Sequence, residues 1–547
     1  MAVMFPIVCM LMELLCIQAM GLNVKTKFGM VKGITTGKAN IWYGIPYAAP
    51  PVGELRWTDP QPPNPWNSVL NCSTPGVGCP QTCMLGGDFC PTKTSEDCLQ
   101  LNVFAPLKQS HLLPVMVFIH GGAFFCGMGP CKAFNGETMV NSTGVILVTI
   151  NYRLGALGFM VYGSGLGAAS GNYGLKDQIL ALEWVQHNIA NFGGDRYQVT
   201  LFGQSAGAQS VGLHLMIPQS GSLFQKAAIL SNPLGIPIQS TESAKTIANA
   251  PVFILKCENP EAPDKVMPCL RSKTAKEIVD AQITFGDTIA FRSASYVRKS
   301  PNYFQWEELW TPVIDNDLIL EQPLVAFREG RFDTTKSLII GNVKDEGNLF
   351  VYYAITDKIN VLEYEAAMKL AFPRHFLNVN EKYPPSVIND DNREQVSQII
   401  TDYNFICPTR NATRSIVSIQ SNIYMYLFDH GETVNPSDGC EHKSCHGDEL
   451  EYTFKSVTFN SYEENALSST MLTYWTNFAK TGDPNTGYNE DLKNLNLSKW
   501  SKYNQENNWP FMHFKTPESS LETDYDSVKC NFWDNVGYPL NISDWPI

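Results

Sequence analysis

A serine that could act as a nucleophile is the first chemical feature of this sequence. Ser205 lies at the centre of Gly203-Gln204-Ser205-Ala206-Gly207, which has the pattern G-x-S-x-G. The apolar run before it predicts a buried strand over 198–202, and the small and apolar residues after it predict a buried helix to about residue 216. The tight turn between them needs glycine, because a neighbouring backbone must approach closely. We therefore predict a nucleophile elbow, with Ser205 at its tip in front of the Ala206 amide.

The serine needs a base and an acid, because an alcohol is a poor nucleophile at neutral pH. A histidine can take the hydroxyl proton while a carboxylate orients the imidazole. Elbow enzymes place these residues after the serine, in the order serine, acid, histidine. The histidines beyond residue 205 are His214, His375, His430, His442, His446 and His513.

The two candidates for the base, His430 and His446, both follow the apolar run 423–428, which predicts a strand. His430 lies nearer the strand, and His446 lies in the loop beyond it. Loops past the carboxyl ends of strands carry catalytic residues in α/β folds, so spacing alone leaves both candidates open. The acid is equally ambiguous, because Asp345 and Glu346 both follow another apolar run.

The elements that must position these residues alternate between strand and helix patterns. Strands are expected over 113–119, 145–151, 198–202, 337–341 and 423–428, and a helix over 173–189. This alternation predicts an α/β fold with a mostly parallel sheet and helices on both faces. Short antiparallel strands are expected over 23–45, a proline-rich loop over 47–66, and helical insertions or a cap over 240–310 and 355–420. We find no repeat or interdomain linker, so residues 22–547 are expected to form a single domain.

The composition excludes some partners. The formal net charge is -13 and the pI is about 5.2, which argues against nucleic acid or an anionic membrane surface as a partner. No C-x-x-C motif with a matching second pair is present, so the sequence predicts no metal site. We expect no cofactor either.

The first 21 residues predict a secretory signal peptide, because a nearly continuous apolar run ends in small residues. The usual Lys or Arg before the apolar core is missing, and a membrane anchor is the alternative. The run is short and contains Glu13, which favours cleavage near Gly21. No other stretch is long and apolar enough to cross a bilayer, so we expect no stable membrane anchor. The protein is expected to be secreted or held within secretory-pathway vesicles.

Cysteines and sequons agree with export. The chain has 15 cysteines, many of them closely spaced, as in disulfide-bonded proteins of oxidising compartments. Five N-x-S/T sequons predict glycosylation, at Asn71, Asn141, Asn411, Asn496 and Asn541.

A series of motifs resembles the type-B carboxylesterase family, which includes cholinesterases, fungal lipases and the inactive neuroligins. The matching segments besides the elbow are Gly44–Ala48, Pro51–Trp57, Ser95–Leu99, His120–Ala123, Asn151–Arg153, Gly174–Gln178, Lys344–Gly347 and His446-Gly447. The resemblance implies an α/β-hydrolase fold with a helical cap. The clustered cysteines over 79–98 and 440–445 are also similar to those of slime-mould secreted esterases.

The resemblance assigns the catalytic roles. It implies Ser205 as the nucleophile, Glu346 rather than Asp345 as the acid, and His446 rather than His430 as the base. The implied reaction is two-step acyl transfer through an acyl-enzyme intermediate. The oxyanion donors that it implies are the backbone N–H groups of Gly122, Ala123 and Ala206.

The resemblance also implies the disulfides Cys79–Cys98, Cys257–Cys269 and Cys407–Cys530. Proximity suggests three more: Cys83–Cys90, Cys126–Cys131 and Cys440–Cys445, with Cys72 left over. The pairs Arg56–Glu96 and Arg153–Asp177 resemble the family's buried ion pairs, and we interpret them as structural.

The expected substrate is a neutral small or medium ester. The residue before the nucleophile is Gln204, where cholinesterases have glutamate, and Gly86-Gly87-Asp88-Phe89-Cys90 lacks the tryptophan that binds their quaternary ammonium group. Both differences predict poor hydrolysis of choline esters. The candidates for the substrate pocket are Gln204, Trp306, Trp310, Leu349 and Phe350. The competing functions are a non-catalytic storage or adhesion protein and an interfacial lipase with a lid over 79–98.

Overall fold

The computed structural model describes residues 22–83, 89–165, 167–292, 308–431, 438–487 and 497–540, with the backbone alone for 285–292. Its centre is an 11-stranded sheet with the order β18-β17-β16-β15-β12-β11-β7-β8-β6-β4-β3. The strands are β3 (Ile34–Thr35), β4 (Ala39–Pro46), β6 (Gln100–Pro106), β7 (Leu113–Ile119), β8 (Ile146–Ile150), β11 (Gly194–Gln204), β12 (Lys226–Leu230), β15 (Ser337–Val343), β16 (Ile423–Phe428), β17 (Pro510–Phe514) and β18 (Ser520–Thr523).

The middle of this sheet is parallel, as the strand and helix alternation predicted. Every neighbouring pair from β8 to β17 is parallel, and antiparallel pairing begins at β6 on one side and at β18 on the other. In a parallel sheet the carboxyl ends of the strands meet at one edge, so the loops after β7, β11, β15 and β16 lie close together. These are the loops that carry the candidate catalytic residues.

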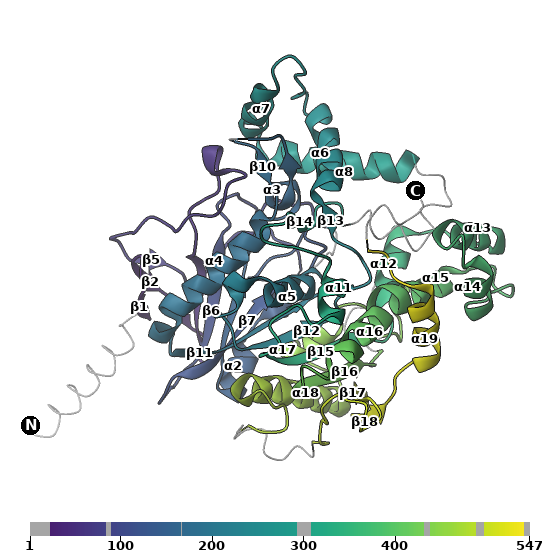
Figure 1. Cartoon of the computed structure of the whole chain (residues 1–547). Helices are drawn as coiled ribbons and strands as arrows, with labels where there is room; N and C mark the ends of the chain where they lie inside the picture. The colour runs from purple at the N-terminus through teal and green to yellow at the C-terminus, as the bar shows by residue number, and fades with distance from the viewer. Residues whose placement is uncertain are drawn as a thin grey trace, which may run out of the picture.

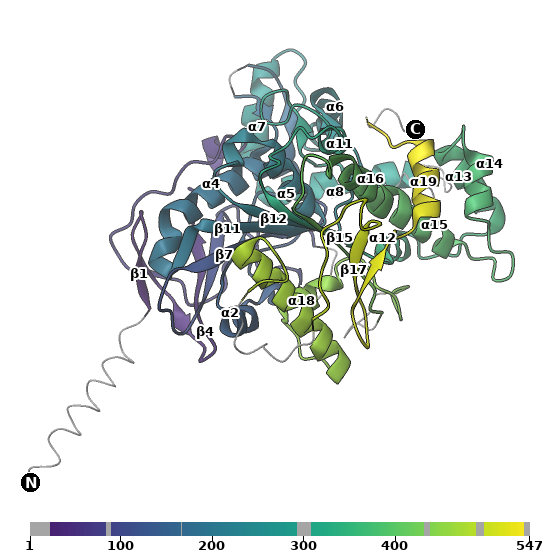
Figure 2. The ribbon, with the colours of Figure 1, turned by 60° about the horizontal axis from the view of Figure 1, so that its bottom comes forward.

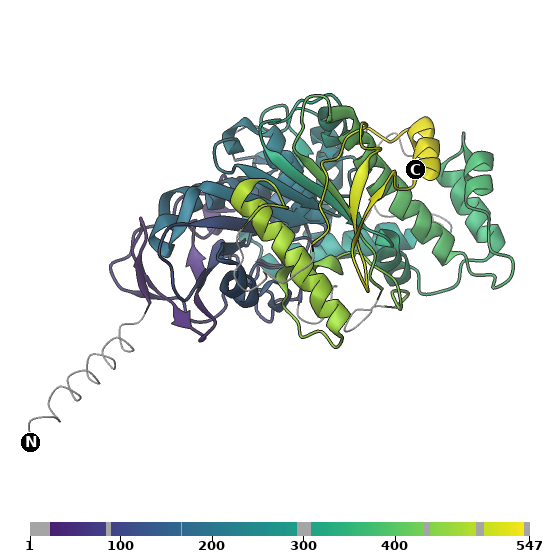
Figure 3. The same cartoon turned by 90° about the horizontal axis from the view of Figure 1, so that it is seen from below.

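Both faces of the sheet are covered because successive strand side chains point to opposite sides. In β7, Val115, Val117 and Ile119 belong to one core cluster, and Met116 and Phe118 belong to the other. The first cluster includes side chains of the helices α4 (Tyr173–Asn188), α5 (Ala206–Met216), α11 (Pro323–Arg328) and α16 (Cys407–Ile416). The second includes side chains of α2 (Glu137–Thr143), α17 (Glu449–Phe454) and α18 (Tyr462–Thr481). Figure 3 shows the long α18 crossing one face of the sheet.

Helices outside the sheet layers form two groups. The first consists of α6 (Thr241–Ile254), α7 (Val266–Ser272) and α8 (Ala275–Arg292), at the top of Figure 1. The second consists of α12 (Glu346–Ala354), α13 (Val361–Ala371), α14 (Phe376–Lys382), α15 (Arg393–Ile400), the π-helical turn Thr401–Ile406 and α19 (Ser527–Val536). Most of these helices lie in the regions where helical insertions were expected, but α12 and α19 of the second group lie outside those regions. Figures 1 and 2 both place α14 and α19 at the side opposite the N-terminal strands.

The N-terminal strands are less regular than the sequence suggested. β1 (Asn23–Lys25) and β2 (Met30–Lys32) are antiparallel, but β2 pairs in parallel with β5 (Leu70–Asn71), which lies beyond the proline-rich loop. Within the described residues, no helix has the length and apolar character to cross a membrane.

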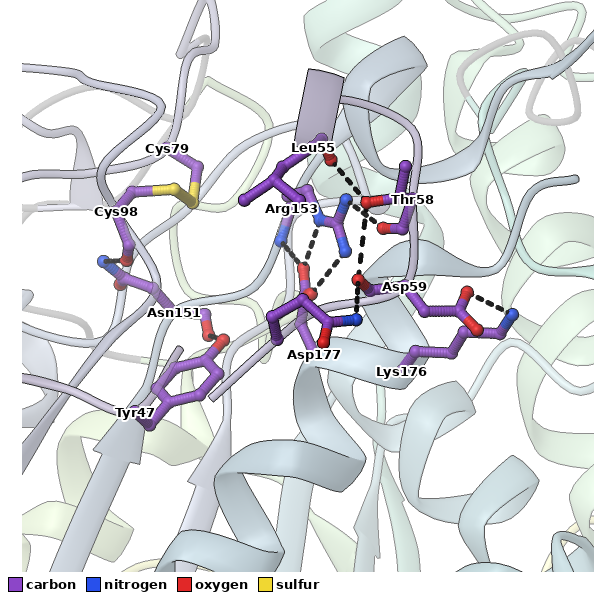
Figure 4. Close-up of polar contacts among 11 residues, drawn as sticks. Tyr47, Leu55, Thr58, Asp59, Cys79, Cys98, Asn151, Arg153, Lys176 and Asp177 are labelled. Atoms are coloured by element: carbon purple, nitrogen blue, oxygen red, sulfur yellow. Dashed lines mark hydrogen bonds and ion pairs between the residues drawn. A yellow bond between two sulfur atoms is a disulfide. The ribbon is translucent and has the colours of Figure 1, made fainter. Parts of the chain in front are cut away.

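A buried polar cluster follows β8 and connects distant segments (Figure 4). The carboxylate of Asp177 accepts hydrogen bonds from Arg153 Nη2 at 2.7 Å, Arg153 Nε at 2.8 Å and the Arg153 backbone at 3.0 Å. The Tyr47 hydroxyl donates to the Asn151 carbonyl at 2.7 Å, and Asn151 Nδ2 donates to the Cys98 carbonyl at 3.0 Å. These contacts hold residues 151–153, just after β8, against the segments that contain Tyr47, Cys98 and Asp177. They agree with a structural role for the Arg153–Asp177 pair.

Five disulfides are present among the described residues. Three are those that the resemblance implied, Cys79–Cys98, Cys257–Cys269 and Cys407–Cys530, and two are those suggested by proximity, Cys83–Cys90 and Cys440–Cys445. The third proximity pair is wrong in this structure, because Cys126 and Cys131 are buried thiols. Besides Arg153–Asp177, the other expected ion pair is present: Arg56 Nη2 lies 2.6 Å from Glu96 Oε2.

Candidate active site

Ser205 lies in a sharp turn between β11 and α5. Its φ and ψ are 59° and -126°, a conformation that non-glycine residues rarely adopt. The flanking glycines are required sterically: a Cβ on Gly203 would lie 2.4 Å from the Gly207 carbonyl oxygen, and one on Gly207 would lie 2.0 Å from the Ile119 carbonyl oxygen. The elbow therefore packs directly against the end of β7, as the G-x-S-x-G pattern predicted.

Glu346 is the first residue of α12, three positions after β15, and is fully buried. Its Oε1 accepts hydrogen bonds from the Val343 backbone at 3.0 Å and from Asn342 Nδ2 at 3.1 Å. Its Oε2 lies 2.5 Å from Nδ1 of His446. A carboxylate in this position accepts the Nδ1 proton, so the lone pair of the neutral imidazole is on Nε2.

His446 lies between β16 and α17, in the segment 438–448, and the residues just before it are tightly constrained. The Cys440–Cys445 disulfide closes it immediately before the histidine. The backbones of Asp345 and Ser444 are bonded, with the Asp345 N–H donating to the Ser444 carbonyl at 2.9 Å, and Asp345 Oδ2 accepts from the Ser444 N–H at 3.1 Å. Asp345 thus holds the histidine loop, whereas its neighbour Glu346 contacts the imidazole.

The rival histidine lies elsewhere. His430 Nδ1 contacts the Thr516 hydroxyl at 3.1 Å and its Nε2 lies 3.5 Å from Glu464, on the side of the molecule covered by α18. The imidazole of His446 packs against two phenylalanine rings, Phe350 at 4.8 Å and Phe405 at 5.2 Å between centroids. The geometry therefore brings Glu346 and His446 together and does not bring His430 to the same place.

Gln204 makes a contact that the sequence did not predict. Its Nε2 lies 3.1 Å from Nε2 of His446, so the amide donates to the nitrogen that a base would use to accept the serine proton. Gln204 is 5 % exposed and Ser205 is 8 % exposed. In this structure the residue before the candidate nucleophile occupies the lone pair of the candidate base.

The loop after β7 lies beside the elbow. Gly122, Ala123 and Phe124 all have positive φ, of 104°, 52° and 56°. In the described part of the chain, the N–H groups of Gly122 and Ala123 donate to no backbone carbonyl. The N–H of Ala206, at the first position of α5, has no intrahelical acceptor either. Three backbone donors near the serine are therefore available for an oxyanion.

Substituting Gly122 tests whether the loop after β7, here called the oxyanion loop, holds the oxyanion. A Cβ on Gly122 would lie 2.3 Å from the Cys126 carbonyl oxygen, so alanine must displace the loop. We expect Gly122→Ala to lower kcat/KM about 100- to 1,000-fold, the usual cost of a lost oxyanion donor. Gly144→Ala is the matched control, because Gly144 also has a positive φ, of 67°, but has open space around its Cβ position. A folded Gly122→Ala variant with unchanged kcat/KM would show that this loop does not hold the oxyanion.

Two further ionisable side chains near the site were not predicted. Burial raises the pKa of Glu449 to about 8, with a further contribution from the charge of Glu346, and Ser231 Oγ donates to Glu449 Oε1 at 2.9 Å. Glu449 follows His446 by three residues, and that proximity was the available signal. Burial also lowers the pKa of His120 to about 4, so the imidazole beside the oxyanion loop is neutral at pH 7.

The remaining predicted residues are placed as follows. Trp310 is buried in the core, Leu349 is half-buried in α12, and Trp306, Asn496, Asn541 and Gly86–Asp88 lie outside the described residues. The sequon residues Asn71 and Asn141 are exposed. Asn411 is half-buried in α16 and its Oδ1 is buried.

The fold and the elbow define a class of protein, the serine hydrolases of the α/β-hydrolase fold. A model of the carboxylesterase family matches residues 21–533, so the chain belongs to that family. It is 37 % identical to the cAMP-regulated D2 protein of Dictyostelium discoideum, over 94 % of this chain and 93 % of that protein. It is 32 % identical to an acetylcholinesterase of Bungarus fasciatus, over 85 % of this chain and 79 % of the enzyme. A solved structure titled PNB esterase superposes with a TM-score of 0.77 at 32 % identity, over 93 % and 99 % of the two chains.

Proposed function

We propose that this carboxylesterase-family hydrolase cleaves neutral esters with Ser205 as nucleophile, His446 as base and Glu346 as the orienting acid. The observation that carries the proposal is the 2.5 Å contact between His446 Nδ1 and Glu346 Oε2. It fixes the imidazole with Nε2 directed toward the elbow, where Gln204 contacts it. A neutral imidazole in this tautomer is the form that general-base catalysis requires.

The reaction follows from these positions. Ser205 Oγ attacks the ester carbonyl as Nε2 of His446 takes its proton, and Glu346 stabilises the imidazolium. The carbonyl oxygen becomes an oxyanion held by the N–H groups of Gly122, Ala123 and Ala206. The imidazolium then protonates the leaving alcohol, and water hydrolyses the acyl-enzyme with the same base. Before the reaction can begin, the hydrogen bond from the Gln204 amide to Nε2 of His446 must break, so that Nε2 can accept the serine proton.

The proposed setting is the secretory pathway. Residues 1–21 would be removed as a signal peptide, leaving a single domain over 22–547. Five disulfides support this setting, because such bonds persist in oxidising compartments. The exposure of Asn71 and Asn141 is compatible with glycosylation at those positions.

Neutral esters are favoured over choline esters. The residue that contacts His446 is an uncharged glutamine, so no carboxylate attracts a quaternary ammonium group at this position. Phe350, packed against the imidazole, adds apolar surface. A direct test is the hydrolysis of p-nitrophenyl esters of increasing acyl length compared with acetylthiocholine. We expect kcat/KM for the neutral acetate to exceed that for acetylthiocholine, and the reverse order would contradict the substrate assignment.

Gln204→Glu should shift this preference. A carboxylate beside the site attracts a cationic substrate, so we expect the ratio of kcat/KM for acetylthiocholine to that for p-nitrophenyl acetate to rise about tenfold. Gln186→Glu, on α4, is the matched control and should leave the ratio unchanged. An equal ratio in the Gln204→Glu variant and the unmutated protein would remove Gln204 from the determinants of specificity.

A non-catalytic role is the second candidate, and one observation favours it. The Gln204 amide hydrogen-bonds to Nε2 of His446 in this structure. A protein that kept this hydrogen bond permanently would not activate its serine, because Nε2 could not accept the serine proton. Absence of hydrolysis across the acyl series would support this candidate. An interfacial lipase is less favoured, because two disulfides bridge the segment that would serve as its lid.

A further inference from the structure

A buried carboxyl contacts the helix that carries the nucleophile. Nε2 of Gln209 donates to Oε2 of Glu308 at 3.3 Å. Glu308 is 9 % exposed and Gln209 is 7 % exposed. Burial raises the pKa of Glu308 to about 7, and no cation is among the groups that shift it. A carboxyl in this environment is poorly solvated and, within the described residues, has no ion-pair partner.

The amide of Gln209 is only partly satisfied. Its Oε1 is buried and accepts no hydrogen bond from any residue that the structure describes. Buried polar atoms in folded proteins nearly always have a partner, because an unsatisfied acceptor costs folding free energy. The triad and the oxyanion donors do not use either side chain. A bound group that donates a hydrogen bond would satisfy this atom.

The pair lies close to the reacting atoms. Gln209 follows Ser205 by four residues on α5, and its backbone N–H donates to the Ser205 carbonyl at 2.9 Å. Residues four apart lie on the same face of a helix, one turn or about 5.4 Å along its axis. Gln209 is therefore one helical turn from Ser205 on α5, and Glu308 contacts Gln209 there.

We propose that Gln209 and Glu308 form a polar subsite that selects esters with a hydrogen-bond donor, a hydroxyl or a protonated amine, on the acyl chain. A donor on such a chain reaches Oε1 of Gln209 and the Glu308 carboxyl. A hydroxyl can also accept a hydrogen bond when Glu308 is protonated. An alkyl group of the same size leaves Oε1 of Gln209 without a donor, and a site that leaves a buried polar atom unpaired discriminates strongly against such a substrate. The inference rests on the proposed esterase function and names its substrate class.

Three p-nitrophenyl esters of similar size test the subsite: 3-hydroxybutyrate, 3-aminobutyrate and the apolar 3-methylbutyrate. We expect the unmutated protein to show a kcat/KM at least tenfold higher for the hydroxy or the amino ester than for 3-methylbutyrate. A preference for the hydroxy ester identifies a hydroxyl as the natural donor, and a preference for the amino ester identifies an ammonium group. A preference for 3-methylbutyrate over both overturns the subsite.

Variants of the pair provide the second readout. Gln209→Leu and Glu308→Leu should each reduce the preference about tenfold while 3-methylbutyrate is still hydrolysed, and Glu308→Gln should keep part of it. Gln186→Leu, a glutamine of α4 away from the pair, is the control. If the variants hydrolyse 3-methylbutyrate but keep the full preference for the donor ester, the subsite is wrong and the esterase function stands. Failure of the unmutated protein to hydrolyse any of the three esters overturns both.

Discussion

Replacing Ser205 with alanine is expected to lower kcat about a million-fold, leaving only the background from substrate binding and the oxyanion donors. The reason is chemical: alanine has no Oγ, so no acyl-enzyme can form and the imidazole of His446 has no proton to accept. The measurement is the hydrolysis of p-nitrophenyl butyrate by the purified variant, with the rate corrected for the spontaneous reaction.

The control for this variant is a second serine. Ser110→Ala, at an exposed position away from the elbow, should leave the rate unchanged. Residue 205 has a positive φ of 59° in the unmutated chain. Equal melting temperatures of Ser205→Ala, Ser110→Ala and the unmutated protein would show that alanine at this position leaves the fold intact. A Ser205→Ala variant that retains more than a few per cent of the activity would place the nucleophile elsewhere.

Replacing Glu346 with glutamine is expected to lower kcat about 10,000-fold, although the two side chains have nearly the same shape. Val343 N–H and Asn342 Nδ2 both donate to Oε1 of Glu346, so the glutamine amide must keep its oxygen on that side. Its NH₂ group then faces Nδ1 of His446. This arrangement favours the tautomer with the proton on Nε2, which cannot accept the serine proton.

Asp345→Asn separates this mechanism from a general effect of charge near the site. Asp345 is adjacent in sequence, and its carboxylate contacts the Ser444 backbone rather than the imidazole. We expect a loss of less than about tenfold for this variant. If Asp345→Asn abolished hydrolysis and Glu346→Gln retained it, the assignment of the acid would be reversed.

The elbow was predictable because its signals are local. The strand, the two glycines and the helix around Ser205 occupy consecutive residues, and the steric need for Gly203 and Gly207 follows from one turn. The parallel direction of the central strands could be predicted from the alternation of strand and helix patterns. The N-terminal strands were less predictable, because β2 pairs with β5 across the proline-rich loop and no local pattern encodes that pairing.

The partners of Ser205 depend on contacts between distant segments, so residue spacing could not settle them. His446 and Glu346 are 100 residues apart, and His430 is nearer to β16 than His446 is. Resemblance to a family gave the choice that the geometry now favours. Gln204 was expected in the substrate pocket, but its contact with His446 was missed for the same reason, because the two residues are 242 positions apart. Glu449 was missed altogether, because its raised pKa comes from burial.

Covalent trapping of the nucleophile tests the central claim most directly. The full chain is treated with a fluorophosphonate, which reacts with an activated serine hydroxyl, and the modified residue is identified by mass spectrometry of its peptides. We expect a single adduct on Ser205, absent in Ser205→Ala and formed far more slowly in Glu346→Gln. No adduct on Ser205, or an adduct on another serine that remains in Ser205→Ala, would contradict it.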